Sequence, residues 1–148
     1  MKGLVLVLAI VALLFSFGTA GAVDNSSKIP QNLQDAYTSA TGTKANFAIW
    51  FPVVPELSAM SWSNILIVSN FNNFSINVSC WFTDFSNEQT QKSYTLPFFG
   101  KKIITLSEAG FGDSLYDVYC VSNQLFGAAV LLVENGSIAT AWPPLFMY

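Results

Sequence analysis

From Phe47 onward, the chain consists of short apolar or alternating runs that turn residues separate at regular intervals. This spacing is typical of an all-β sandwich or barrel, because strands repeat every second residue and helices have a longer period. The runs are interrupted by Gly, Pro or Asn before any of them reaches the length of a buried helix. The pattern predicts eight strands, at 47–54, 63–70, 75–85, 90–97, 101–107, 114–122, 125–134 and 137–142.

Eight short strands in about 100 residues fit two packed antiparallel sheets, an Ig-like β-sandwich of about seven or eight strands. Asn135-Gly136, between the last two predicted strands, indicates a tight hairpin, since both residues accept a positive φ. We therefore assign 47–148 to a single sandwich domain. The polar segment 23–46 before it is interpreted as a linker with at most one helical turn around 31–37.

The N-terminal residues 1–22 contain one lysine, an apolar stretch and the small residues Ala20-Gly21-Ala22. This arrangement predicts a secretory signal peptide that is cleaved after Ala22. An uncleaved anchor stays open, because the uncharged stretch 3–22 is about long enough to cross a bilayer. So does a retained filament-core helix, because Lys2-Gly3 before an apolar helix resembles an archaeal type IV pilin processing site. All three interpretations place the rest of the chain outside the cytoplasm.

The two cysteines lie on separate predicted strands, and alternation places both on inner faces. On the strand 75–85, Cys80 faces inward when Asn77 faces outward, because neighbouring side chains point to opposite faces. On 114–122, Cys120 faces inward when Asp117 faces outward. Two inward cysteines in an exported chain predict a Cys80–Cys120 disulfide. A pair of buried free thiols is the alternative.

Four sequons for N-glycosylation begin at Asn25, Asn73, Asn77 and Asn135. They lie in the polar segment, at the beginning of a strand, at an outward strand position and at a hairpin tip, where a glycan would stand in water. We predict that at least one is used. On the same strand as Asn77, Trp81 is predicted to face outward. It is a candidate for stacking on a sugar, and packing in the core or against a subunit is the alternative.

Charged residues make up only 10% of the chain, and the chain contains neither Arg nor His. From Val23 onward, five lysines stand against nine acidic residues. This balance argues against nucleic acid as a partner, since phosphates require a basic face. With so little charge, Asn, Ser and Thr supply most of the polar surface. We expect either sugars or neighbouring subunits to cover it.

The residue types for common catalytic sites are missing. Without histidine, a Ser-His-Asp or Cys-His nucleophile cannot form, and the chain contains no P-loop or GxGxxG motif. Two cysteines without histidine cannot complete a structural zinc site. Asp113 and Asp117 are spaced too far apart on a strand for a retaining carboxylate pair. We therefore expect no enzyme activity, no cofactor and no metal.

The segment after Glu134 contains no charge and includes the apolar residues Trp142, Leu145, Phe146 and Tyr148. It is expected either to fold back across its own sandwich or to dock on a neighbouring subunit, since a free apolar tail promotes aggregation. The strand 47–54 follows a polar linker and has the same ambiguity. It would add to the edge of the next subunit's sheet, with Pro52 restricting it to an edge. Its expected subunit-contact residues are Phe47, Ile49 and Phe51.

A set of turn and strand residues resembles a loose family of small secreted β-sandwich modules found in prokaryotic surface proteins. The pattern is a Trp before a strand that ends in Asn, a strand that ends in an aromatic residue and Asp, and L-P-x-x-G before an I-x-L strand. The resemblance implies the fold and transfers no catalytic residues, while the two cysteines and the single copy depart from the pattern. The matching residues are Trp62, Asn70, Phe82, Asp84, Leu96, Pro97, Gly100, Ile104 and Leu106.

These features lead us to expect a secreted, glycosylated structural subunit of an extracellular filament or surface layer. It would polymerise with copies of itself through exchange of a strand or tail and through hydrophobic burial. One alternative is a monomeric carbohydrate-binding or adhesion module at the cell surface. Another is a type IV pilin-like subunit that keeps its N-terminal helix, in which case alone it would contact a membrane.

Overall fold

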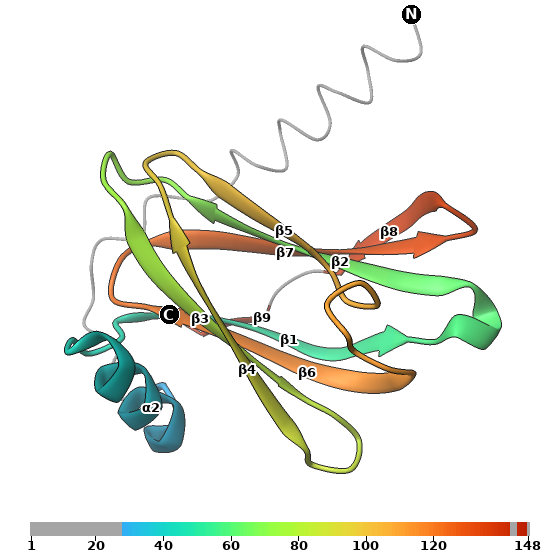
Figure 1. The fold of residues 1–148 in the computed structure, drawn as a ribbon, viewed down its shortest axis with the longest axis horizontal. Coiled ribbons are helices and arrows are strands. Elements are labelled where there is room, and N and C mark those ends of the chain that lie inside the picture. Colours follow the sequence, from blue (N-terminus) through green and yellow to red (C-terminus); the bar gives the residue numbers. More distant parts are fainter. Residues whose placement is uncertain (1–27, 143–144, 148) are drawn as a thin grey trace, which may run out of the picture.

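The structure is a computed structural model that describes residues 28–142 and 145–147. The predicted signal peptide, the Asn25 sequon and Tyr148 lie outside the described residues. Within these residues, one α-helix and nine strands are present, and the strands form two antiparallel sheets that pack face to face (Figure 1). The predicted all-β sandwich is confirmed.

One sheet has five strands in the order β4-β3-β6-β1-β9, and the other has four in the order β5-β2-β7-β8. All eight predicted strands are present, and β9 is the strand that periodicity did not predict, because it has only three residues. The bounds are β1 Phe47–Glu56, β2 Trp62–Asn70, β3 Ile76–Thr83, β4 Gln89–Leu96, β5 Lys101–Thr105, β6 Ser114–Ser122, β7 Phe126–Glu134, β8 Ser137–Trp142 and β9 Leu145–Met147.

The main core lies between the sheets and is built from every second residue of the strands. On β2, Leu66 and Val68 are fully buried while their neighbours are half-buried, as alternation requires. The facing sheet contributes Phe51, Phe82 and Val118 among others. At the turn between β7 and β8, Asn135 and Gly136 have φ values of 49° and 76°, which confirms the predicted hairpin.

Strand β1 continues through two prolines, beyond the end predicted at Pro55. A register shift between Phe51 and Val54 marks a bulge, and Val53 has a φ of 57°. Strand β9 pairs only with residues 48–50 of β1, so among the described residues Pro52 has no strand on that side. Neither β6 nor β9 pairs with Pro52, so its missing N–H costs no ladder hydrogen bond, and β1 is an edge strand over its second half.

The polar segment before the sandwich contains α2, Gln31–Thr41, which corrects its interpretation as a linker. The helix ends at Gly42, whose φ is 73°. Leu33 and Tyr37 are buried against the outer face of the five-stranded sheet. The Tyr37 hydroxyl donates to Asn77 O or Asn123 Oδ1, at 3.1 and 3.2 Å, and accepts the Asn123 N–H. The helix is therefore fixed to the sandwich as part of one body.

Candidate functional site

Strand β9 lies at the edge of the five-stranded sheet, where it pairs antiparallel with β1 through three residue pairs. The pairs are Ala48 with Met147, Ile49 with Phe146 and Trp50 with Leu145. The preceding strand, β8, which contains Trp142, belongs to the other sheet. The described part of the tail thus folds back across its own sandwich, which is one of the two expected outcomes.

The other residues expected to contact a neighbour lie on β1, which pairs with β6 at eight positions between Phe47 and Glu56. Ile49 and Phe51 are buried in the main core, and Phe47 packs partly buried against it. These three side chains fill the core of their own chain, and they lie on the first half of β1, which runs between β6 and β9. The strand 47–54 thus pairs within its own chain, which is one of the two outcomes expected for it, and β9 is the strand at the edge.

The predicted disulfide between Cys80 and Cys120 is confirmed. The two residues are directly opposite each other on β3 and β6, with Cα atoms 4.0 Å apart. Both strands belong to the same sheet, whereas the disulfide of antibody domains joins the two sheets. Both residues are fully buried in the main core, as alternation along the two strands predicted.

Trp81 lies on the outer face of β3, as expected, but α2 covers it. Its side chain is only 3% exposed and packs with Leu33, Tyr37 and Tyr119. A sugar therefore has no access to the ring, which corrects the expected carbohydrate contact at this residue. Tyr119 is buried in the same cluster, and its desolvation raises the pKa of the hydroxyl to about 12.

The three sequon asparagines within the described residues, Asn73, Asn77 and Asn135, are all exposed. The Asn77 side chain accepts a hydrogen bond from Thr95 and lines a shallow polar hollow with Ser79 and Ser93, beside the C-terminal end of α2. Each site is accessible to a glycan, and occupancy of the sites stays a prediction.

Three loops meet at one end of the sandwich, here called the aromatic end: residues 71–75, 97–100 and 123–125. The Asn72 amide donates to Leu125 O at 2.7 Å, and the Phe99 N–H donates to Asn72 O at 3.2 Å. These loops expose five large apolar side chains, an unusual concentration for loop tips of a small protein. They are Phe71, Phe74, Phe98, Phe99 and Leu125.

Buried Asn70 holds the aromatic end in place. Its side-chain amide donates to Phe74 O and Pro97 O, at 2.7 and 2.8 Å, and its side-chain oxygen accepts from Asn72. Its backbone N–H donates to Gly100 O. One side chain thus satisfies the backbones of two loops, and the aromatic residues are displayed on an ordered scaffold.

Two glycines at this end permit close approaches that a larger residue would block. A Cβ on Gly127 would lie 2.6 Å from the ring of Phe71, so the ring lies directly over β7. A Cβ on Gly100 would lie 2.6 Å from the ring of Pro97, and the Gly100 N–H donates to Pro97 O. The glycine of L-P-x-x-G is therefore required by the close packing of this turn against Pro97.

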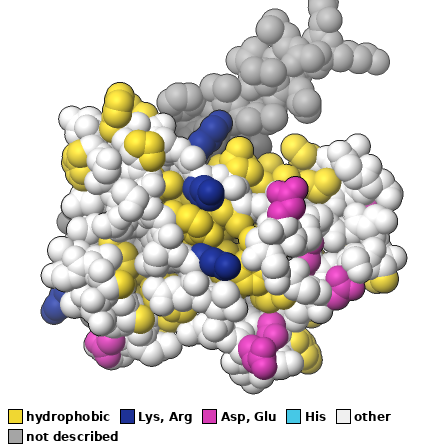
Figure 2. All heavy atoms as spheres, viewed as in Figure 1, with side chains coloured by type: hydrophobic (Ala, Val, Ile, Leu, Met, Phe, Trp, Pro, Cys, Tyr) yellow, Lys and Arg dark blue, Asp and Glu magenta, His cyan; other side chains and the backbone are white. Residues whose placement is uncertain are grey.

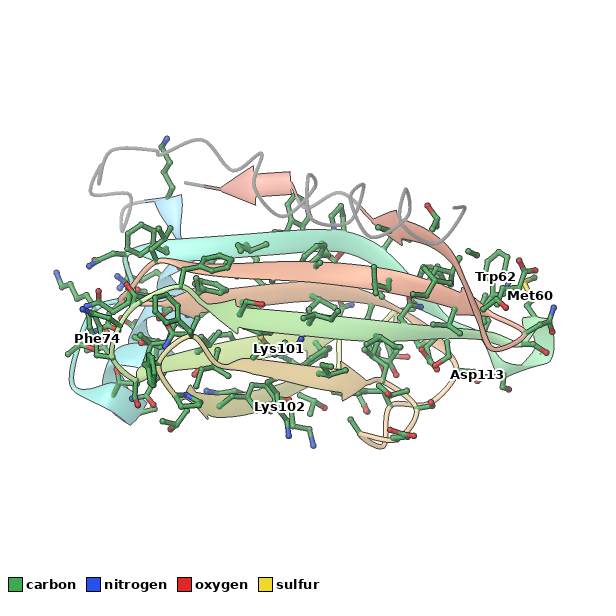
Figure 3. The ribbon with its side chains drawn as sticks, turned by 90° about the horizontal axis from the view of Figure 1, so that it is seen from above. Met60, Trp62, Phe74, Lys101, Lys102 and Asp113 are labelled. Atoms are coloured by element: carbon green, nitrogen blue, oxygen red, sulfur yellow. A yellow bond between two sulfur atoms is a disulfide. The ribbon has the colours of Figure 1, made fainter. Side chains whose placement is uncertain are left out.

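The opposite end, here called the acidic end, contains residues 57–61, 84–88, 106–113 and 135–136. Figure 3 places Phe74 at one end of the sandwich and Met60 and Asp113 at the other. Of the eight acidic residues described, six lie in or next to the loops of the acidic end: Glu56, Asp84, Glu88, Glu108, Asp113 and Glu134.

Hydrogen bonds tie these loops together as well. Asp113 accepts from Ser58 Oγ and Ser58 N–H, at 2.7 and 3.0 Å, and these bonds hold the pKa of its carboxyl below the ordinary value. The Asp84 side chain accepts the N–H groups of Ser86 and Glu88. The acidic end also exposes the apolar side chains of Phe85, Met60 and Val53.

Glu56 is the buried member of the acidic end. One oxygen of its carboxylate accepts the Asn64 N–H at 2.8 Å, and burial raises the pKa of the group above its ordinary value. The Asn64 side-chain amide donates to Pro55 O, while its oxygen is buried without a partner among the described residues. These contacts fix the end of β1 to the beginning of β2.

Sequence reasoning missed both ends, although one signal points to them. In an antiparallel run of strands, successive connections alternate between the two ends. The connections after β1, β3, β5 and β7 form the acidic end, and those after β2, β4 and β6 form the aromatic end. Sorting loop residues by this alternation separates the exposed phenylalanines from most of the carboxylates.

Residues 28–142 and 145–147 contain no group of three His, Cys, Asp or Glu side chains arranged to hold a metal ion. In the same part of the chain, α2 falls far short of the length and apolar content that crossing a membrane requires, and no other helix there meets them.

Comparisons with known proteins identify a fold and no family. No family model and no curated protein matches the chain. Among solved structures, the chain is similar to the crystal structure of Thermotoga maritima 1070, with a TM-score of 0.53 and 13% sequence identity. The match covers 69% of this chain and 92% of that one. At this identity the similarity supports the sandwich fold alone.

Proposed function

We propose that this protein is an exported structural subunit of an extracellular filament or surface layer, and that copies assemble by exchanging β9. The observation that carries the proposal is the attachment of β9. It pairs with β1 at only three positions, and the strand before it belongs to the other sheet. A strand from a second copy can make the same three pairs, because the edge of β1 is identical in every copy.

The sequence of the connection supports exchange. Only Pro143-Pro144 separates β8 from β9 in the chain. Short connections between elements favour swapping, because a short connection can strain the closed form. The exchanged strand would keep its hydrogen bonds, so little free energy separates the closed and exchanged forms.

Export and glycosylation belong to the same proposal. A disulfide is stable in oxidising compartments and rare in the cytosol, so Cys80–Cys120 supports a location outside the cytoplasm. The exposed Asn73, Asn77 and Asn135 are accessible to glycans, which would supply polar surface to a chain poor in charge. The partner is a second copy of the chain.

Cysteine cross-linking tests the exchange directly. Ala48 and Met147 are opposite each other in the register, so the double variant A48C/M147C should link β9 to whichever copy it occupies. We expect a ladder of covalent multimers on a non-reducing gel of the assembled protein. The single variants A48C and M147C are the controls, and neither should give more than a dimer. A double variant that forms only internal links while the protein is assembled would refute strand exchange.

A further inference from the structure

We infer that the aromatic end of one copy docks on the acidic end of the next, so that copies line up head to tail. The inference rests on the proposed function only in taking a second copy of this chain as the partner. It concerns a different surface from β9, and it starts from two exposed apolar patches at opposite ends of one molecule.

The patch at the aromatic end is large and ordered. Phe98 and Phe99 are 63% and 66% exposed, and their ring centroids are 5.6 Å apart. The hydrogen bonds of Asn70 and Asn72 fix the loops that carry them. A preformed apolar surface binds a partner without a large ordering cost, and Phe is enriched at the centres of interfaces.

The patch at the acidic end has Phe85 at its most exposed point. This side chain is 80% exposed, and its backbone N–H donates to Ser114 Oγ at 3.4 Å, which holds the loop against β6. Met60 is also exposed at this end of the sandwich, on the turn 57–61. Glu88 lies on the same turn as Phe85, and Asp113 directly precedes the Ser114 that accepts the Phe85 N–H.

The charges of the two ends are complementary. The loops of the aromatic end contain no acidic residue, and Lys101 and Lys102 follow directly on β5. Asp35 on α2 is the acidic residue on that side of the molecule, and it accepts a hydrogen bond from Gln31. On the face shown in Figure 2, lysine side chains gather near the centre and carboxylates lie mainly toward the acidic end. When one molecule follows another in the same direction, the carboxylates of the acidic end therefore meet loops that carry no like charge.

A second copy accounts for both patches, whereas a lipid surface accounts for one. Anionic lipid would attract the aromatic end through its phenylalanines and lysines, but it would leave Phe85 and Met60 in water. A contact between unlike surfaces at opposite ends does not close on itself, and repetition of it produces an open row of subunits. That geometry is the one a filament requires.

The test uses variants that disable one end each. Phe98→Ser with Phe99→Asn removes the aromatic patch, and Asn suits the positive φ of 48° at position 99. Phe85→Ser removes the apolar centre of the acidic end. The matched control is Ile103→Thr, which removes an equally apolar side chain, 53% exposed, from the middle of β5. Circular dichroism establishes that each variant is folded.

Sedimentation velocity over a concentration series gives the readout. Every variant carries A48C/M147C oxidised as the monomer, which locks β9 to its own β1, so that strand exchange cannot contribute to growth. We expect wild type and I103T to form growing rows, and each end variant alone to associate about tenfold more weakly or worse. An equimolar mixture of the two end variants should stop at dimers, because only one intact contact can form between them. An interface confined to β9 would not limit this mixture to dimers.

Two results would overturn the inference. The first is growth of both end variants equal to that of wild type; if A48C/M147C still gives its ladder, strand exchange stands and the end contact fails. The second is a monomeric wild type whose binding to vesicles of anionic phospholipid is lost in F98S/F99N, which would assign the aromatic end to a lipid surface. Conversely, a dimeric mixture without a cross-linked ladder would retain the end contact and refute strand exchange.

Discussion

Reduction of the Cys80–Cys120 disulfide should destabilise the sandwich by an amount that its loop length sets. The bond joins residues separated by 40 positions, and a loop of this size gives about 4 kcal/mol in the chain-entropy estimate. The two residues are already opposite each other in the β3–β6 ladder, which backbone hydrogen bonds hold independently. We therefore expect the native structure to survive reduction, with the effect in the unfolded state.

The expected shift is large enough to measure easily. For a folded body of about 120 residues, the entropy of unfolding is near 0.25 kcal/mol per kelvin, so a loss of 4 kcal/mol lowers Tm by about 15 °C. In urea, the midpoint should fall and the m-value should rise, because the open chain exposes more surface when unfolded. Thermal and urea unfolding with and without reductant provide both values.

The variant C80A/C120A is the control for reductant effects elsewhere. It should be destabilised in both buffers, by slightly more than reduced wild type because two buried sulfur atoms are removed, and reductant should not change it further. If the free energies of unfolding of oxidised and reduced wild type differ by less than about 1 kcal/mol, the loop-entropy estimate is contradicted. It would indicate that the unfolded chain stays compact between β3 and β6 without the bond.

Three further predictions concern the contacts that organise the fold. Tyr37→Phe removes a hydroxyl that hydrogen-bonds to Asn77 and Asn123, so the free energy of unfolding in urea should fall by about 1–3 kcal/mol. Protease cleavage should then appear first in α2. Unchanged stability would mean that apolar contacts alone hold α2. Gly100→Ala places a Cβ 2.6 Å from the Pro97 ring and should lower the free energy of unfolding by about 1–3 kcal/mol. Its control, Gly112→Ala, meets no atom within 4 Å and should be nearly neutral in the same unfolding experiment. Equal effects of the two substitutions would contradict the requirement for glycine in the 97–100 turn. The folded-state pKa of Glu56 is raised, so the folded protein keeps this proton where the unfolded chain loses it, and stability falls as pH rises through the folded pKa. Glu56→Gln keeps an acceptor for the Asn64 N–H, and should raise Tm at neutral pH while matching wild type in acid; a gain that is independent of pH would refute the assignment.

The strands could be predicted because alternation and turn residues are local properties of the sequence. Each apolar run gave one strand, and Asn135-Gly136 specified its own turn. Strand β9 could not be predicted in this way, since three residues are too few to show a period. Only one turn of the helix α2 was predicted, for a different reason. Its first turns combine Gln, Asn and Asp with only two buried apolar residues, Leu33 and Tyr37, and its stability comes from the sheet beneath it.

Alternation predicted the inner face of β3 correctly and its outer face incompletely. Cys80 and Phe82 are in the core, as expected, and Asn77 is exposed. Trp81 was predicted to face outward and does so, yet a helix from 40 residues earlier in the chain covers it. A two-residue period gives the side of a sheet on which a residue lies. The period does not tell what packs on that side of the sheet. The sugar-binding hypothesis required the outer side of Trp81 to be uncovered.

The two ends illustrate what a sequence pattern leaves undecided about phenylalanine. Phe82 and Phe98 are the same residue type, and composition alone would assign both to the core. The first alternates within a strand, while the second lies between Pro97 and Gly100, where no strand can bury it. Because antiparallel connections alternate between the ends, all the exposed loop phenylalanines except Phe85 are at one end, and Phe85 stands among carboxylates at the other. Folding alone gives no reason to expose aromatic rings at both ends with different charges around them, whereas repeated end-to-end contact gives one.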